Sequence, residues 1–93
     1  MTFEIKLSRQ AAKDWEQIQS LADAHALKRH AEHLHSILSR NPWQNPPPFK
    51  KLTRELQDCY ARRLNEKHRF VYQVHKKEQI VFVLAMLGHY NDN

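Results

Sequence analysis

The chain reads Tyr60-Ala61-Arg62-Arg63-Leu64-Asn65-Glu66-Lys67-His68-Arg69-Phe70-Val71-Tyr72-Gln73-Val74 in the stretch that decides its fold. On both sides of Asn65-Glu66-Lys67 the side chains alternate with a period of two, which is typical of half-buried strands. The polar run between the two strands predicts a tight reversal. We therefore expect an antiparallel hairpin in which Phe70, Tyr72 and Val74 share one face.

A third strand should follow this hairpin. Lys76-Lys77-Glu78 predicts a second turn, and the run from Gln79 to Leu87 is almost wholly apolar. Continuous apolar runs are expected of strands that are covered on both faces. The second half of the chain is therefore predicted to form a meander of three antiparallel strands.

The first half of the chain predicts one strand and two helices. Phe3, Ile5 and Leu7 alternate with polar residues, as in a short strand. Ser8 stands at a helix N-cap position, and the helix behind it should reach about Ser20. Asp23 can cap a second helix, whose apolar stripe consists of Leu27, Ala31, Leu34 and Leu38.

A proline-rich segment separates the two halves. Asn41-Pro42 should end the second helix, because the residue before proline avoids helical geometry. Pro46-Pro47-Pro48 predicts a stiff extended arm, and Trp43 is expected to plug the junction of helix and sheet. The order is β-α-α-β-β-β, an α+β fold in which an antiparallel sheet packs against two N-terminal helices within a single domain, 1–93.

Composition restricts the classes of function. The 93 residues carry a net charge of +5 with a pI near 9.6, which favours an anionic partner such as nucleic acid or an acidic protein. No apolar run approaches the ~20 residues of a membrane-spanning helix, and the N-terminus lacks the order of a signal peptide. The single cysteine, Cys59, excludes an intramolecular disulfide. We expect a cytoplasmic protein that does not bind a membrane.

Basic and aromatic residues are interleaved in the second half. The basic residues are Lys50, Lys51, Arg54, Arg62, Arg63, Lys67 and Arg69, and the aromatic ones include Phe49, Tyr60, Tyr72 and Tyr90. Cations that neutralise phosphates, together with rings that stack on unpaired bases, suit single-stranded RNA. Arg63 and Arg69 should stand on neighbouring strands and converge on one phosphate. The alternative is a solvated edge whose charges prevent aggregation.

Histidines occur at two places in the chain. Four of them crowd the second helix, namely His25, His30, His33 and His35. No thiolate or convergent carboxylate accompanies them, so we expect no metal site and no cofactor. His89-Tyr90 follows the last strand directly after Gly88, and a histidine at a strand end can act as general acid or base.

Three runs together resemble the YoeB/Txe family of toxins in the RelE superfamily. They are Pro46-Pro47-Pro48-Phe49-Lys50-Lys51-Leu52, the stretch Tyr60 to Val74 quoted above, and Gly88-His89-Tyr90. The resemblance is dense over residues 41–90. It implies the toxin of a type II toxin–antitoxin pair, which enters the ribosomal A site and cleaves messenger RNA without a metal ion.

The resemblance also implies roles for individual residues. In the family's reaction the ribose 2′-hydroxyl attacks the adjacent phosphate. By motif, Arg69 would hold that phosphate with help from Arg63, His89 would protonate the leaving 5′-oxygen, and Tyr90 would orient a nucleotide. Further RNA contacts would come from Lys51, Arg62 and His68. The implied partner is a cognate acidic antitoxin, and both a homodimer and a toxin–antitoxin heterocomplex stay open.

The sequence departs from the family at the general base. A gapless alignment places Lys50 where the family has a catalytic glutamate. An amine is ordinarily protonated at neutral pH, although neighbouring cations disfavour the charged form. Lys50 is therefore expected to act as a base or as an electrostatic stabiliser, with Glu55 as a substitute base. The alternative is that the change abolishes cleavage.

A second departure lies in the loop Leu56-Gln57-Asp58, where the family usually has Leu-Ser-Gly. Aspartate tolerates left-handed backbone, so the turn can survive. Two other functions remain as alternatives: a protein that binds antitoxin and RNA without cleavage, and a topoisomerase-inhibiting toxin of the related ParE type. Arg69 and His89-Tyr90 favour the nuclease over the ParE type.

Overall fold

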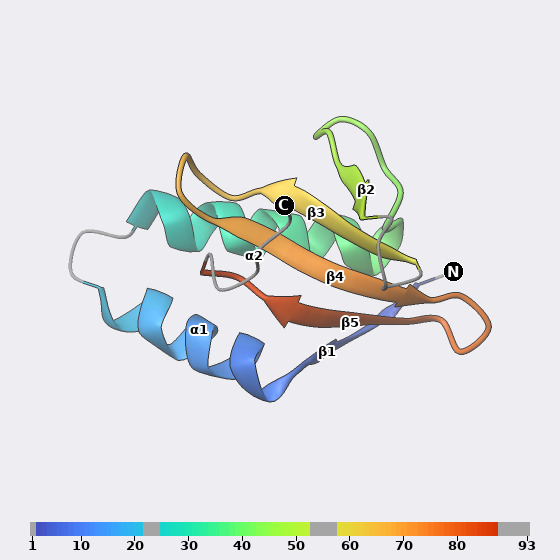
Figure 1. The fold of residues 1–93 in the computed structure, drawn as a ribbon, viewed down its shortest axis with the longest axis horizontal. Helices are drawn as coiled ribbons and strands as arrows, with labels where there is room; N and C mark the ends of the chain where they lie inside the picture. Colours follow the sequence, from blue (N-terminus) through green and yellow to red (C-terminus); the bar gives the residue numbers. More distant parts are fainter. Residues whose placement is uncertain (1, 22–24, 53–57, 88–93) are drawn as a thin grey trace.

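The computed structural model describes residues 2–21, 25–52 and 58–87. Its elements are, in order, β1 (Glu4–Leu7), α1 (Arg9–Ser20), α2 (His25–Arg40), β2 (Lys50–Leu52), β3 (Cys59–Arg63), β4 (Arg69–His75) and β5 (Ile80–Ala85) (Figure 1). The predicted α+β class and its two N-terminal helices are confirmed. The predicted order lacks one strand, β2, which is only three residues long.

The five strands form one sheet in the order β1-β5-β4-β3-β2. The four C-terminal strands pair antiparallel, and three of them, β3, β4 and β5, are the predicted meander. β1 instead pairs parallel with β5, so the sheet is mixed. The two helices between β1 and the later strands form the long crossover that a parallel arrangement requires.

Local sequence signals explain the ends of several elements. The Ser8 hydroxyl accepts a hydrogen bond from the Ala11 amide at 3.0 Å, which confirms the predicted N-cap, and it donates to the Leu84 carbonyl at 2.8 Å. In the β3–β4 turn, the Asn65 side chain accepts hydrogen bonds from the amides of Lys67 and His68. Asp58 has a φ of 56°, as expected where the family has glycine. The predicted cap Asp23 lies outside the described residues.

The main core lies between the helices and one face of the sheet. Its buried residues from helices and sheet include Ala11, Ile18, Ala31, Leu34, Leu38, Tyr60, Phe70, Tyr72, Val74, Val81 and Val83. Trp43 packs against it, with its ring 5.8 Å from that of Phe3, as predicted for the helix–sheet junction. In Figure 1, β3 and β4 pass in front of α2. We call the covered side the helix face and the opposite side the outer face.

The outer face carries only a small apolar cluster. It consists of Leu52, Cys59, Ala61 and Val71, with Leu84 packed against it. Along β5 the residues Val81, Val83 and Ala85 are buried, whereas Ile80, Phe82 and Leu84 are half-buried. The expectation of a β5 strand fully covered on both faces is therefore wrong for the described residues, because both helices lie on one side.

Candidate functional site

Three cations come together on the outer face. Arg63 and Arg69 are directly opposite each other on β3 and β4, and Lys50 on β2 is opposite Ala61. Because directly paired residues share a face and Ala61 is two positions from Arg63, Lys50 and Arg63 are diagonal neighbours, with Cα atoms ~7–8 Å apart. All three side chains are exposed. Like charges placed directly opposite each other destabilise a sheet, so this arrangement favours a site for an anion.

Arg62 does not belong to this group, which corrects the prediction that it binds RNA. Its side chain is 1% exposed on the helix face. Nε donates to the Tyr72 hydroxyl at 3.1 Å, Nη1 to the Pro47 carbonyl at 2.6 Å, and Nη2 to the Pro42 carbonyl at 3.0 Å. A buried guanidinium with these bonds cannot also bind a phosphate.

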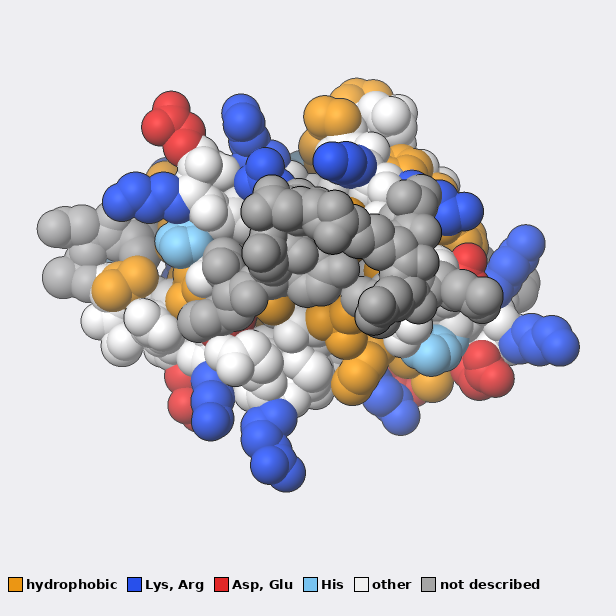
Figure 2. All heavy atoms as spheres, in the orientation of Figure 1, with side chains coloured by type: hydrophobic (Ala, Val, Ile, Leu, Met, Phe, Trp, Pro, Cys, Tyr) orange, Lys and Arg blue, Asp and Glu red, His pale blue; other side chains and the backbone are white. Residues whose placement is uncertain are grey.

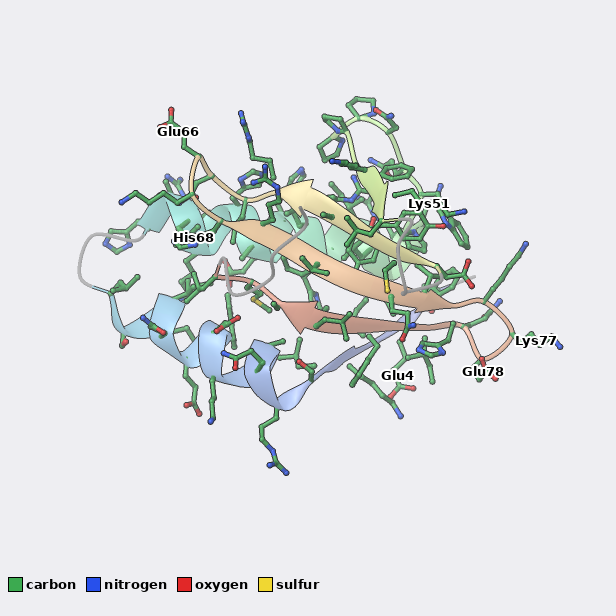
Figure 3. All side chains as sticks on the ribbon, viewed as in Figure 1. Glu4, Lys51, Glu66, His68, Lys77 and Glu78 are labelled. Carbon is green, nitrogen blue, oxygen red and sulfur yellow. The ribbon has the colours of Figure 1, made fainter. Side chains whose placement is uncertain are left out.

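The structure also separates Lys51 and His68 from the outer-face cations. Lys51 is exposed and lies at the β2 edge of the sheet (Figure 3). Its pairing with Tyr60 puts it on the helix-face side of that edge. His68 is half-buried, and its Nδ1 is buried without a hydrogen-bond partner among the described residues. Neither residue is grouped with Lys50, Arg63 and Arg69, and RNA contacts by Lys51 and His68 stay predictions.

The aromatic residues between the cations are part of the core. Tyr60 and Tyr72 stack with ring centroids 5.6 Å apart, and Trp43 Nε1 donates to the Tyr60 hydroxyl at 3.1 Å. Burial raises the pKa of the Tyr72 phenol, while the hydrogen bond and charge of Arg62 lower it by less. The neutral phenol donates to the Pro42 carbonyl at 2.9 Å. These two rings are therefore not available to stack on bases.

The end of β5 is anchored beside the outer-face cations. Ala85 is opposite Val71 of β4, near Arg69. The buried Asp14 carboxylate of α1 accepts hydrogen bonds from the amides of Met86 at 2.9 Å and Leu87 at 3.3 Å. The chain continues from here toward two predicted site residues. These residues, His89 and Tyr90, lie outside the described residues, as do Arg54 and Glu55.

Two hollows lined by described residues lie beside the sheet. A groove of about 410 Å³ borders the cation group and is lined by His30, Pro47, Pro48, Arg63, Leu64, Asn65 and Glu66. A second hollow, of about 280 Å³, has a mostly apolar lining: Leu7, Trp15, Ala31, Glu32, His35, Phe70 and Met86. Of these two hollows, the groove includes an outer-face cation, Arg63, and offers room for a ligand chain beside it.

Charge is widely distributed over the described surface. Figure 2 views the molecule from the outer face, and Lys and Arg side chains stand along its upper edge near β2 and the β3–β4 turn. Within the described ranges, no three His, Cys, Asp or Glu side chains gather as metal ligands would. None of the helices there is long and apolar enough to span a membrane.

Comparison with solved structures places this fold among RelE-type toxins. A YoeB/ParE toxin from Agrobacterium tumefaciens superimposes with a TM-score of 0.83 at 24% identity, covering 95% of this chain and 100% of that one. In a YoeB–YefM complex from Staphylococcus aureus the values are 0.78 and 26%, with 95% and 98% covered. In an archaeal RelE–RelB complex from Pyrococcus horikoshii OT3 they are 0.71 and 25%, with 98% and 100% covered.

The family itself follows from the sequence profile. The profile of the YoeB-like toxin of bacterial type II toxin–antitoxin systems matches residues 7–90. The chain therefore belongs to the YoeB-like toxin family, which confirms the resemblance read from the three runs. A search among curated proteins gave no match.

Proposed function

We propose that this YoeB-like toxin is a ribosome-dependent endoribonuclease that cuts messenger RNA in the ribosomal A site without a metal ion. The observation that carries the proposal is the grouping of Lys50, Arg63 and Arg69 on the outer face of the sheet. Three cations within reach of one another suit a phosphate that gains negative charge in the transition state. The resemblance to the YoeB/Txe family also implies cleavage of messenger RNA, and so supports the proposal.

The proposed reaction is an attack within the RNA strand. A bond forms between the 2′-oxygen and the phosphorus, and the bond from phosphorus to the 5′-oxygen breaks, leaving a 2′,3′-cyclic phosphate and a 5′-hydroxyl. A base takes the proton of the 2′-hydroxyl, and an acid returns one to the 5′-oxygen. Arg63 on β3 and Arg69 on β4 bind the oxygens of the scissile phosphate. His89 serves as the acid, and Tyr90 stacks on a nucleotide.

Lys50 completes the proposed site. It occupies the position of the family's glutamate and is a diagonal neighbour of Arg63, so both side chains can reach the same phosphodiester. We propose that it acts on the 2′-hydroxyl as a base or on the phosphate as a charge stabiliser. The substitution also supports a second candidate function, namely RNA and antitoxin binding without cleavage.

We further propose an acidic antitoxin as the protein partner. The solved S. aureus and P. horikoshii relatives are toxin–antitoxin complexes. The net charge of +5 on this chain suits a partner of opposite charge. Such a partner could cover the outer-face cations directly and so silence the site.

The test is to map messenger RNA 5′ ends in bacteria that express the chain. We expect new 5′-hydroxyl ends within translated codons, reduced at least ~100-fold by Arg69→Ala because a charge-stabilising group is lost. Arg29→Ala is the matched control, since Arg29 is an exposed arginine on α2. Growth arrest without new ends would show that the nuclease assignment is wrong and would favour a binding protein or a ParE-type toxin.

A further inference from the structure

One buried side chain holds the whole segment that precedes Lys50. The Arg62 guanidinium donates to the carbonyls of Pro42 and Pro47, and so ties the proline-rich arm, taken here as residues 42–48, to β3 at two points. The same group lies over the Phe49 ring, 5.0 Å from its centroid. Phe49 also meets the Tyr60 ring edge-on at 5.5 Å. The arm therefore reaches Lys50 in a fixed position.

Tyr72 reinforces this hold from the next strand. Its hydroxyl accepts a hydrogen bond from Arg62 Nε and donates one to the Pro42 carbonyl at 2.9 Å. Both side chains are fully buried on the helix face. A buried charge of this kind is costly unless its hydrogen bonds are made, so Arg62, Tyr72 and the two carbonyls define one arrangement of the arm.

β2 has little of its own to hold it in place. It has three residues, lies at the edge of the sheet and pairs only with β3. Leu52 is buried in the outer-face cluster and fixes its far end. Lys50, at the near end, directly follows Phe49. The position of Lys50 relative to Arg63 therefore depends on the arm and on the side chain that binds it.

We propose that Arg62 is a positioning residue that sets Lys50 beside Arg63 on the outer face, acting through the carbonyls of Pro42 and Pro47. The proposal rests on the proposed function of Lys50 in RNA cleavage. Arg62 touches no RNA; it acts from the helix face on a residue of the outer face. Loosening the arm by ~1 Å should lower the cleavage rate constant by ~100-fold.

A double-mutant cycle on ribosome-bound messenger RNA tests the coupling. Arg62→Met keeps the length of the side chain but removes its five donors, and Tyr72→Phe removes only the hydroxyl. Each should lower kcat more than it raises KM, with the larger loss in Arg62→Met. In the Lys50→Ala background neither should lower kcat further. Should Arg62→Met fail to fold, Tyr72→Phe alone decides the cycle.

Amide hydrogen exchange of residues 50–52 provides a readout without RNA. We expect Arg62→Met and Tyr72→Phe to raise exchange in β2 at least ~10-fold while the β4–β5 amides stay protected. Additive losses of kcat together with unchanged exchange in β2 would overturn the positioning role, even if the wild type cleaves RNA. Absent cleavage by the wild type, with faster exchange in the variants, would contradict the proposed function but support the hold on β2.

Discussion

At the scale of single residues, the Arg63 side chain reaches the outer face and that of Arg62 fills the core. Lys50 and Lys51 are divided in the same way, because successive residues of a strand point to opposite sides. The alternation in the sequence predicts β3 and β4 correctly. It does not reveal which side the helices cover, and arginine is rarely buried unless it is paired. For this reason the sequence alone grouped Arg62 with the RNA-binding residues.

Cys59 gives a prediction at this scale. Its side chain is fully buried, and burial, with a smaller contribution from the Asp58 carboxylate, raises the pKa of the thiol. Since the thiolate is the reactive form, we expect a thiol reagent at pH 8 to modify the folded protein at least ~100-fold more slowly than the denatured protein. The rate of labelling checks this, because Cys59 is the only cysteine. Equal rates in the two states would contradict the burial of Cys59.

At the scale of elements, the sequence predicts those caps and turns that are set by side chains bonding to the nearby backbone. The Ser8 cap, the Asn65 turn and the left-handed Asp58 follow from side chains that bond or shape their own backbone. β2 is too short to show a period. The parallel pairing of β1 with β5 joins residues far apart in the chain, and no local pattern encodes it.

Asp14 makes a contact between α1 and the end of β5 that the sequence did not predict. Its carboxylate accepts hydrogen bonds from the amides of Met86 and Leu87, and the Gln10 side chain donates to it at 3.0 Å. The available signal was an acid placed between Ala11 and Ile18 in the buried stripe of a helix. Only the fold shows that the acid binds the end of β5.

Removing this carboxylate should be costly for stability. Asp14→Ala leaves two backbone amides without their acceptor, and we expect the free energy of unfolding to fall by ~2–4 kcal/mol. Urea denaturation measures the change, with Glu16→Ala, at an exposed position of the same helix, as control. The control should change the value by less than ~0.5 kcal/mol. Similar values for both variants would contradict the anchoring role of Asp14.

At the scale of the whole molecule, one sheet serves two purposes on its two faces. The helix face supports the core and holds the arm through Arg62, and the outer face presents Lys50, Arg63 and Arg69. Composition and motif predict the fold class, the toxin family and two of these three cations as phosphate ligands. Which predicted site residues lie on the helix face and which on the outer face depends on tertiary packing. Residue types alone do not encode that packing.

The two adjacent lysines of β2 make the most direct test of this division. The measurement is the single-turnover rate constant for cleavage of messenger RNA on programmed ribosomes by Lys50→Ala and Lys51→Ala. Both variants lose one exposed positive charge from the same strand. A third variant, Lys50→Arg, keeps the charge but cannot act as a base. Its rate distinguishes a base from a charge stabiliser.

The predicted result is a large difference in the cleavage rate constant between Lys50→Ala and Lys51→Ala. Lys50→Ala should lower the rate constant ~100-fold or more, as expected for a group that acts on the reacting atoms. Lys51→Ala should stay within about threefold of the wild type, because a screened charge on the other side of the sheet acts weakly. Equal losses at the two positions, or an unchanged rate for Lys50→Ala, would contradict the assignment of the outer face as the cleavage site.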